Sequence, residues 1–132
     1  AAINGVAAGA GVGLALVCDI AVAARSASFV LTFGPQLGLV PDLGVTWFLP
    51  RAIGRARARA LALLGDKLPA EKAAEWGLVW TCVDDAECLP TARALAARLG
   101  RGSADRQTRL HGRREELPCE EGVVTGSEGR LS

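Results

Sequence analysis

The sequence predicts an α/β fold in which helices pack on a small sheet. Residues 1–24 run through a short apolar segment, a glycine-rich turn, a small-residue apolar segment and a second short apolar run, which is the order strand, turn, helix, strand. Farther along, helix-like segments at 55–64 and 69–77 each stop at a glycine, as helices often do. An apolar run at 78–83 then predicts another buried strand.

Composition is typical of a single globular domain and argues against several kinds of partner. Half of the 132 residues are hydrophobic and the formal net charge is +1, so the chain has material for a core and no excess charge for nucleic acid or an anionic membrane surface. The uninterrupted apolar run over residues 6–18 holds 13 residues, whereas a membrane span needs about 20. We therefore expect no membrane segment, and a helix over residues 9–18 that is buried nearly all round.

The cysteines are too far apart in the sequence for a zinc site. Cys18, Cys82, Cys88 and Cys119 include no C-x-x-C pair, and His111 is the one histidine of the sequence. We therefore expect no metal site, and scattered reduced thiols of this kind are typical of a cytoplasmic protein. No charged segment precedes the apolar start, so a signal peptide is not expected either.

Glycine, proline and aspartate set the expected limits of the remaining elements. Residues 33–43 are rich in glycine and proline and predict a loop, and residues 44–49 predict a short helix that ends at Pro50. Asp84-Asp85 predict the cap of a last helix over residues 89–99. All helices and strands expected in this way lie before residue 100.

The chain changes character after Gly100. Of residues 101–132, 12 are charged and only 7 are apolar, with no helical or strand period. We therefore expect one domain over residues 1–100 and a disordered tail over residues 101–132. The chain also begins without methionine and inside an apolar strand, so it is expected to be a piece of a longer protein.

The glycine-rich turn is the first candidate site. A helix that begins among glycines presents N–H groups without partners and the positive end of its dipole, which suits an anion or an oxygen that becomes negative during a reaction. Two nucleotide-binding patterns fit poorly, because Leu14 stands where a Rossmann fingerprint needs a third glycine and no lysine for a P-loop occurs before Lys67. A tight turn with a purely structural role is the alternative.

A longer set of residues is similar to a known family. The segments are Ala2-Ile3-Asn4-Gly5-Val6-Ala7-Ala8-Gly9-Ala10-Gly11, Cys18-Asp19, Gly38-Leu39-Val40-Pro41-Asp42, Gly65-Asp66-Lys67-Leu68 and Trp76-Gly77-Leu78-Val79. Their order and spacing resemble the crotonase (enoyl-CoA hydratase/isomerase) superfamily. Within it, Pro41-Asp42 and residues 65–68 are most similar to the 2-(1,2-epoxy-1,2-dihydrophenyl)acetyl-CoA isomerases of phenylacetate breakdown. The resemblance implies a partial crotonase-like ββα spiral fold.

The resemblance also implies a site for an acyl-CoA thioester. The backbone N–H of Ala10 would be one of two oxyanion-hole donors, and Asp42 would be the acid/base residue. The residues beside the substrate would be Gly9, Gly11 and Gly44. The chemistry agrees, because proton removal next to a thioester builds negative charge on the carbonyl oxygen. Asp42 has an alternative role as the N-cap of the helix that follows it.

The hydratases of the family use two glutamates, and neither is present here. The first position matches Gly13 and the second falls at Thr32 or Phe33. The resemblance therefore implies isomerisation by one base rather than hydration. The reaction would be a proton transfer or a ring-epoxide isomerisation on a CoA thioester, in phenylacetate or fatty-acid-type catabolism. It implies no separate cofactor, because coenzyme A is part of the substrate, and a homotrimer or homohexamer as the full-length assembly.

In the family, the second oxyanion donor precedes the segment that this chain matches. We therefore expect the chain alone not to turn over an acyl-CoA. The alternative function is non-catalytic, either as a remnant of the same fold or as an interaction module whose exposed sheet edge pairs with another chain. A nucleotide-binding module is the third candidate.

Two further sets of side chains have more than one interpretation. Arg51, Arg55 and Arg59 are spaced to share one helix face, which would be solvated or would meet the phosphates of coenzyme A. The tryptophans are expected in the core rather than at a substrate platform; they are Trp47, Trp76 and Trp80.

Overall fold

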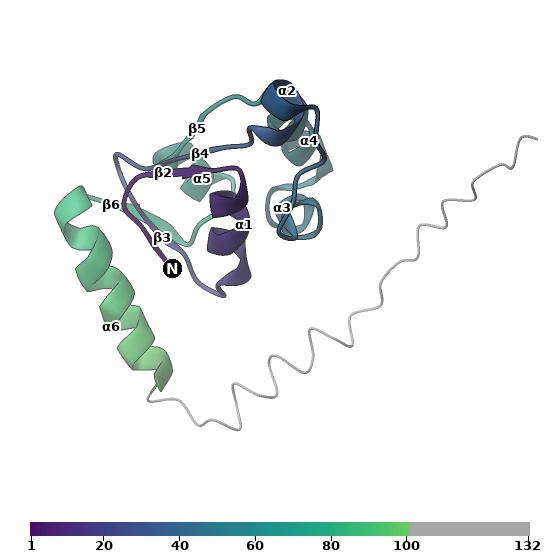
Figure 1. The fold of residues 1–132 in the computed structure, drawn as a ribbon. Coiled ribbons are helices and arrows are strands. Elements are labelled where there is room, and N and C mark those ends of the chain that lie inside the picture. The colour runs from purple at the N-terminus through teal and green to yellow at the C-terminus, as the bar shows by residue number, and fades with distance from the viewer. Residues whose placement is uncertain (101–132) are drawn as a thin grey trace, which may run out of the picture. The chain divides into compact units, whose positions relative to one another are not determined.

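Short strands and helices alternate along residues 1–100, which are the residues that the computed structural model describes. Residues 1–97 form one compact unit (Figure 1). The strands are β1 (Ala2–Ile3), β2 (Val6–Ala8), β3 (Val22–Ala24), β4 (Ser28–Val30), β5 (Leu68–Pro69) and β6 (Thr81–Val83). The helices are α1 (Ala10–Val17), α2 (Phe33–Leu37), α3 (Val45–Ile53), α4 (Arg55–Leu64), α5 (Ala70–Glu75), the 3₁₀ turn η1 (Asp85–Glu87) and α6 (Cys88–Gly100). The tail expected over residues 101–132 lies outside the described residues.

Two three-stranded sheets organise the described residues. One has the order β1-β3-β6 and the other β2-β4-β5. β1 and β2 run parallel to β3 and β4 respectively, with Ala2 opposite Val22 and Ala7 opposite Phe29, while β5 is antiparallel to β4. Parallel strands need a crossover connection, and α1 lies in the connection from β1 to β3 and in that from β2 to β4. The predicted α/β class, with helices on small sheets, is confirmed.

β3 lies in the middle of its sheet and is fully buried. Val22, Ala23 and Ala24 are each exposed by 1% or less. β1 pairs with one edge of β3 and β6 pairs with the other. A strand buried on both faces has a continuous apolar sequence, which explains why this run was recognisable as a strand. The larger buried side chains of the same core include Val12, Phe29, Val45, Leu49 and Leu61.

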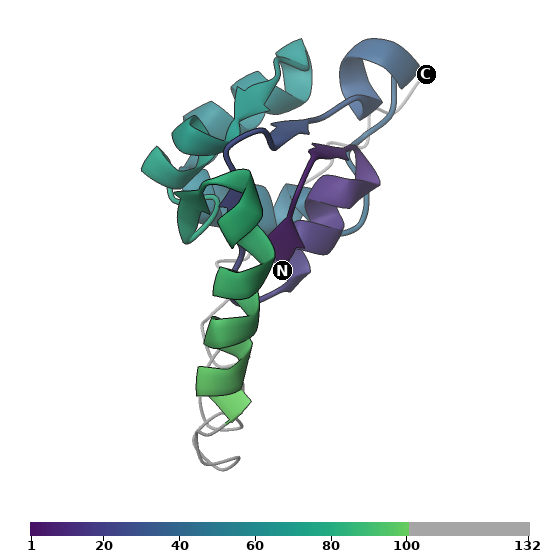
Figure 2. The ribbon, with the colours of Figure 1, turned by 90° about the vertical axis from the view of Figure 1, so that its left-hand side faces the viewer.

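α1 is buried on one face only. Val12, Gly13 and Ala15 are buried, whereas Leu14 is 65% and Val17 is 61% exposed. The helix contacts β2 and α3, and Figure 2 shows it directly after β2. The expectation that this helix is buried nearly all round is therefore wrong, because a uniformly apolar helix sequence does not reveal which face is covered.

A short helix, α2, occupies part of the segment that was expected to be a loop. Pro35 is tolerated because it lies in the first turn, where the N–H groups have no helical acceptor in any case. Gly38 follows the helix with a φ of 64°, and its N–H donates to the Gly34 carbonyl at 3.0 Å. The loop prediction is wrong for residues 33–37 and is confirmed for residues 38–43.

α3 continues through Pro50 instead of ending there. Proline removes one helical hydrogen bond, but Val45, Leu49 and Ile53 stay on one face and are all buried. The Gly54 N–H closes the last turn by donating to the Pro50 carbonyl at 3.0 Å. Burial of this apolar stripe therefore outweighs the cost of the proline.

The other predicted helices are confirmed. α4 is followed by Gly65 in the left-handed conformation, with a φ of 71°, and α5 and α6 lie close to the expected positions. The strand predicted at 78–83 is shorter, because only β6 pairs with β3. Within residues 1–100, no helix is long and apolar enough to cross a membrane.

Candidate active site

The first part of the candidate site is the start of α1. Gly9 precedes the helix with a φ of 50° and a ψ of −115°, a conformation open almost only to glycine. The Gly9 N–H donates to the Val30 carbonyl at 2.9 Å, and the Gly9 carbonyl accepts the Val12 N–H at 3.0 Å. Ala10 is the first residue of the helix and is exposed, so its N–H has no acceptor within the helix and points along the positive end of the dipole.

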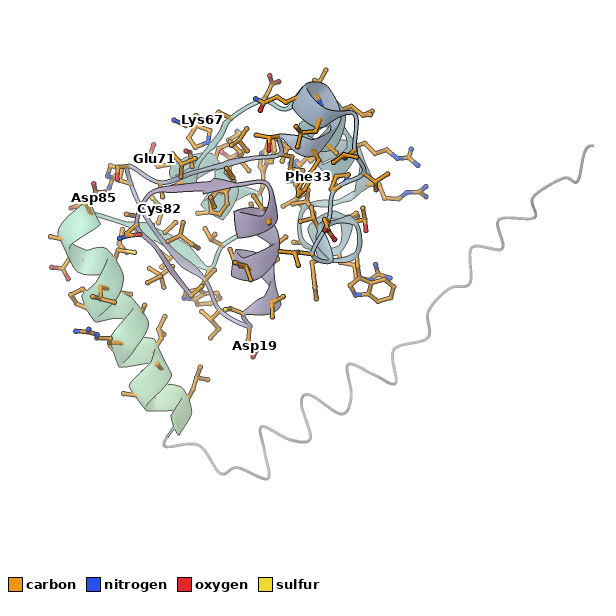
Figure 3. All side chains as sticks on the ribbon, viewed as in Figure 1. Asp19, Phe33, Lys67, Glu71, Cys82 and Asp85 are labelled. Carbon is orange, nitrogen blue, oxygen red and sulfur yellow. The ribbon has the colours of Figure 1, made fainter. Side chains whose placement is uncertain are left out.

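Thr32 and Phe33 flank this helix start. A Cβ added at Gly9 would lie 3.2 Å from Thr32 Oγ1 and 3.5 Å from the Phe33 ring. Figure 3 shows Phe33 at the beginning of α2, on the side that faces α1. The structure therefore brings the second position of the glutamate pair next to Gly9, the residue before Ala10, and that position carries a hydroxyl and a phenyl group instead of a carboxylate.

The segment before α3 lies against the middle of α1. A Cβ added at Gly13 would be 2.6 Å from the Leu43 carbonyl oxygen and 2.8 Å from Leu43 Cβ. Asp42 directly precedes Leu43, and neighbouring Cα atoms are about 3.8 Å apart. The chain at Asp42 is therefore next to the residue that contacts Gly13, which lies about one helical turn after Ala10.

The Asp42 carboxylate is exposed and is tied to its own loop. Its Oδ1 accepts the N–H of Leu43 at 2.6 Å, and its main-chain oxygen accepts the Val45 N–H at 3.1 Å. The N-cap of α3 is Gly44, with no side-chain cap bond. The alternative role of Asp42 as the helix N-cap is therefore wrong, because the carboxylate binds the N–H of the next residue rather than one in the first helical turn.

The glycines predicted beside the substrate differ in their surroundings. Gly11 has open space where a Cβ would stand, whereas a Cβ at Gly44 would be 2.9 Å from the Phe48 ring. Gly44 also has a φ of 73°. Gly9, Ala10 and Gly11 lie together at the start of α1. The Gly13–Leu43 contact places the residue between Asp42 and Gly44 against the same helix.

Sequence reasoning missed the part played by Gly13 and Leu43. Leu43 is the one non-glycine residue of the described chain with a positive φ, 50°. Its contact joins segments 30 positions apart, which no local spacing indicates. The sequence does show Leu43 directly before Gly44 in a loop. That pattern indicates a contact with α1 only after the structure has placed the loop against this helix.

The candidate site consists of one backbone amide at a helix start and one carboxylate. Such a pair can move a proton to and from a carbon whose neighbouring oxygen becomes negative. The two positions that would supply a carboxylate pair carry none, so the geometry does not provide a second acid/base group there. Within residues 1–100, no group of three or more His, Cys, Asp or Glu side chains could hold a metal ion.

The arginine and tryptophan expectations need correction. Arg51 lies on α3, whereas Arg55 and Arg59 lie on α4, so the three do not share one helix face. The Arg51 guanidinium stacks on the Trp47 ring, 3.2 Å from its centroid. Trp47 is 46% and Trp80 is 72% exposed, so neither belongs to the core. Trp76, the third tryptophan, is half-buried and packs against the core.

A separate polar cluster joins the β3–β4 turn to α5 and to the η1 turn before α6; Figure 3 labels Glu71 and Asp85 of this cluster. The Arg25 guanidinium donates to the Asp84 carboxylate at 3.0 Å and pairs with Glu71, and these partners raise the pKa of Arg25. The Asp85 carboxylate accepts the Ser26 N–H at 3.0 Å, and hydrogen bonding to Ser26 lowers the pKa of Asp85. Asp84 occupies the N-cap position of η1, which leads into α6, as predicted, but it makes no side-chain cap bond, because its carboxylate binds Arg25 instead.

The chain is similar to known proteins over most of its length. Residues 1–112 match the family described as enoyl-CoA hydratase/isomerase. The chain is 60% identical over 98 residues to 1,2-epoxyphenylacetyl-CoA isomerase of Escherichia coli K12, which covers 74% of this chain and 37% of that protein. It is 40% identical over 99 residues to carnitinyl-CoA dehydratase of Salmonella paratyphi A, which covers 75% of this chain and 38% of that protein.

Solved structures agree with these matches. The crystal structure of an enoyl-CoA hydratase from Mycobacterium avium superposes with a TM-score of 0.81 at 36% identity, covering 88% of this chain and 51% of the other. The fold that the sequence resemblance implied is thereby confirmed. The chain spans less than half the length of the two sequence relatives.

Proposed function

Because the chain belongs to the enoyl-CoA hydratase/isomerase (crotonase) family, we propose that it carries the catalytic centre of an acyl-CoA isomerase. In this proposal the N–H of Ala10 is an oxyanion-hole donor and Asp42 is the acid/base residue. The reaction is a proton transfer, or a ring-epoxide isomerisation, on a CoA thioester. The 60% identity to 1,2-epoxyphenylacetyl-CoA isomerase favours phenylacetate breakdown as the pathway.

One observation carries the choice of isomerisation over hydration. Asp42 directly precedes Leu43, which packs on Gly13 of α1, while Gly13 and the Thr32–Phe33 pair offer no carboxylate. Hydration by paired carboxylates needs one group to activate water and another to protonate carbon. A single carboxylate suffices when the same proton is removed from one carbon and returned to another.

The proposed step conserves atoms and charge. The Asp42 carboxylate takes a proton from the carbon next to the thioester, and the electron pair of that C–H bond forms an enolate whose oxygen accepts a hydrogen bond from the Ala10 N–H. The Asp42 carboxyl then returns the proton to a different carbon of the conjugated system. The thioester and the carboxylate are regenerated, so substrate and product are isomers.

Proton exchange at the α-carbon of phenylacetyl-CoA in D₂O tests this proposal. Exchange is the first half of the reaction and requires only the base and an oxyanion donor, so we expect it even though full turnover by the chain alone is not expected. Asp42→Asn should reduce the exchange rate by about 10²-fold or more. The asparagine oxygen can still accept the Leu43 N–H, so the melting temperature should stay close to that of the parent chain.

Asp66→Asn is the matched control, because Asp66 is exposed and follows α4, outside the proposed site. It should leave the exchange rate unchanged. An exchange rate in Asp42→Asn equal to that of the parent chain would contradict the role of Asp42. Exchange equal to that of buffer in the parent chain would contradict the proposed centre.

Assembly, location and cofactor use belong to the same proposal. The family resemblance supports a homotrimer or homohexamer of the full-length protein in the cytoplasm. It also supports a reaction without any cofactor besides the coenzyme A of the substrate. Sedimentation of the purified protein and activity after exhaustive dialysis against a chelator would test the first and last of these points.

The second candidate is a non-catalytic interaction module, and an open groove favours it. Among residues 1–100, β1 and β2 are each paired on one edge only. Residues 1–7 line the groove together with Gly11, Leu14 and Ala15 of α1. Val6 is 61% exposed there. If this sheet edge binds a partner, the chain should self-associate or capture a strand from another chain, and Val6→Lys should weaken that binding. A parent chain that is monomeric and melts cooperatively would contradict this second function.

A further inference from the structure

Gly13 is a buried residue in the middle of α1, and a side chain there has no room. The added Cβ would be 2.6 Å from the Leu43 carbonyl oxygen and 2.8 Å from Leu43 Cβ. Neither atom is the far end of a flexible side chain, so the whole Leu43 backbone would have to move by several tenths of an ångström. By contrast, Gly11 lies on the same helix with nothing within 4 Å of an added Cβ.

Leu43 holds an unfavourable backbone conformation against this glycine. A φ of 50° is rare for a leucine, because its Cβ crowds the following carbonyl. The next residue, Gly44, also has a positive φ, 73°, so two successive residues turn the chain into α3. A conformation of this kind persists only when surrounding contacts impose it, and the α1 surface at Gly13 is such a contact.

The position of the Asp42 carboxylate depends on the same backbone. Asp42 Oδ1 accepts the Leu43 N–H at 2.6 Å, and the Asp42 carbonyl accepts the Val45 N–H at 3.1 Å. The carboxylate is thus fixed to the peptide group that packs on Gly13. Any displacement of Leu43 displaces the carboxylate relative to the amide of Ala10, since that amide belongs to α1 itself.

We propose that Gly13 is a positioning residue: its lack of a side chain lets Leu43 pack on α1 and thereby sets the Asp42 carboxylate relative to the Ala10 amide. The same contact excludes any carboxylate side chain at position 13, which restricts the centre to chemistry with one base. The inference rests on the proposed function for its catalytic meaning, and on the Gly13–Leu43 geometry for its structural part.

The test compares four forms of the 132-residue chain: the parent, Gly11→Ala, Gly13→Ala, and Gly13→Ala combined with Leu43→Gly. Amide ¹H–¹⁵N spectra report the backbone of Asp42 and Leu43 without any need for activity. Gly13→Ala should move both resonances, and Gly11→Ala should leave them in place. The double variant removes the 2.8 Å contact with Leu43 Cβ, and the glycine at 43 accepts a positive φ freely, but the contact with the carbonyl oxygen of position 43 remains. The Asp42 resonance should therefore return part of the way toward its parent position.

Exchange of phenylacetyl-CoA α-protons supplies the functional readout. Gly13→Ala should lower the maximal exchange rate about 100-fold, the effect expected of a misplacement of roughly 1 Å, and leave the half-saturating thioester concentration unchanged. The double variant should recover part of that rate. If the role of Gly13 were purely structural, Gly13→Ala would change folding without a selective loss of the maximal exchange rate, and the double variant would not recover that rate.

Each outcome decides a different point. Unmoved Asp42 and Leu43 resonances in Gly13→Ala would overturn the inference and leave the proposed function intact. Moved resonances with a parent-like exchange rate would overturn the positioning role. Exchange that is absent from the parent would remove the proposed function, and the positioning role with it. If Gly13→Ala does not fold, Leu43→Gly alone replaces it. Its maximal exchange rate should be about tenfold below that of the parent, because the carboxylate is held less firmly. A parent-like exchange rate would overturn the inference.

Discussion

The two halves of the candidate site, the amide at Ala10 and the carboxylate at Asp42, are held in place by different kinds of contact. The amide half depends on main-chain geometry, since Gly9 takes a conformation open almost only to glycine and ties its N–H to the Val30 carbonyl at 2.9 Å. The carboxylate half depends on packing, since Leu43 is held at a φ of 50° against Gly13. The amide half therefore tolerates changes in the side chain at position 10, whereas the carboxylate half is sensitive to the shape of a neighbouring helix.

The largest expected effect comes from removing the amide donor itself. Ala10→Pro deletes the N–H at the first helical position, where proline is well tolerated. The loss of one oxyanion donor typically costs about 3–4 kcal/mol of transition-state stabilisation. The exchange rate of phenylacetyl-CoA should therefore fall at least about 10²-fold with a nearly unchanged melting temperature. An exchange rate within a factor of about two of the parent would show that this N–H does not act on the thioester.

The next effect concerns the residue that aims the amide. Gly9→Ala places a Cβ at a φ of 50° and 3.2 Å from Thr32 Oγ1. The free energy of unfolding should fall by about 2–3 kcal/mol because the required backbone conformation is strained for alanine. Denaturant titration measures this change directly. A loss below about 0.5 kcal/mol would mean that Gly9 relaxes easily and that the amide half is less rigid than its hydrogen bonds indicate.

A smaller effect is expected on the carboxylate side. Gly44→Ala also demands a left-handed alanine, with a φ of 73°, but the contact it meets is the Phe48 ring at 2.9 Å, which can turn aside. The unfolding free energy should fall by about 1 kcal/mol. If Gly44→Ala cost more than Gly9→Ala in the same titration, the assignment of the rigid half of the site would be reversed.

The smallest effect lies outside both halves, in the polar cluster around Arg25. The pKa of Asp85 is lowered in the folded chain by hydrogen bonding to Ser26, so this contact stabilises the fold above the ordinary carboxyl pKa and loses its effect as the pH falls through the lowered pKa. The melting temperature should therefore drop on acidification below about pH 4, and less so in Asp85→Asn. Asp66→Asn, outside the cluster, should keep the full dependence. An identical acid profile in Asp85→Asn and the parent would contradict the contact.

The amide half was predictable from the sequence, whereas the geometry of the carboxylate half was not. Glycines at the start of an apolar helix indicate an open helix N-terminus, and the structure has Ala10 as its first residue. The resemblance supplied Asp42, but its N-cap alternative failed because Gly44 takes that place. The Gly13–Leu43 contact joins segments distant in sequence, and local periodicity carries no information about such pairs.

The errors in the fold have the same origin. α4 was predicted well because its helical residues and Gly65 are neighbours in the sequence. The α3 helix runs past Pro50 because tertiary burial of Val45, Leu49 and Ile53 overrides a local signal. The exposed face of α1 was missed for a related reason, since its apolar residues do not distinguish a covered face from an open one.

The most direct test of the central claim is a titration of the ¹⁵N-labelled chain with phenylacetyl-CoA, followed at two neighbouring amides. The Gly9 N–H is already bound to the Val30 carbonyl, so its resonance should move little. The Ala10 amide proton should shift downfield as the thioester oxygen accepts its hydrogen bond. A thioester that binds and leaves the Ala10 resonance unmoved, or moves Gly9 more than Ala10, would contradict the assignment of Ala10 as the oxyanion donor.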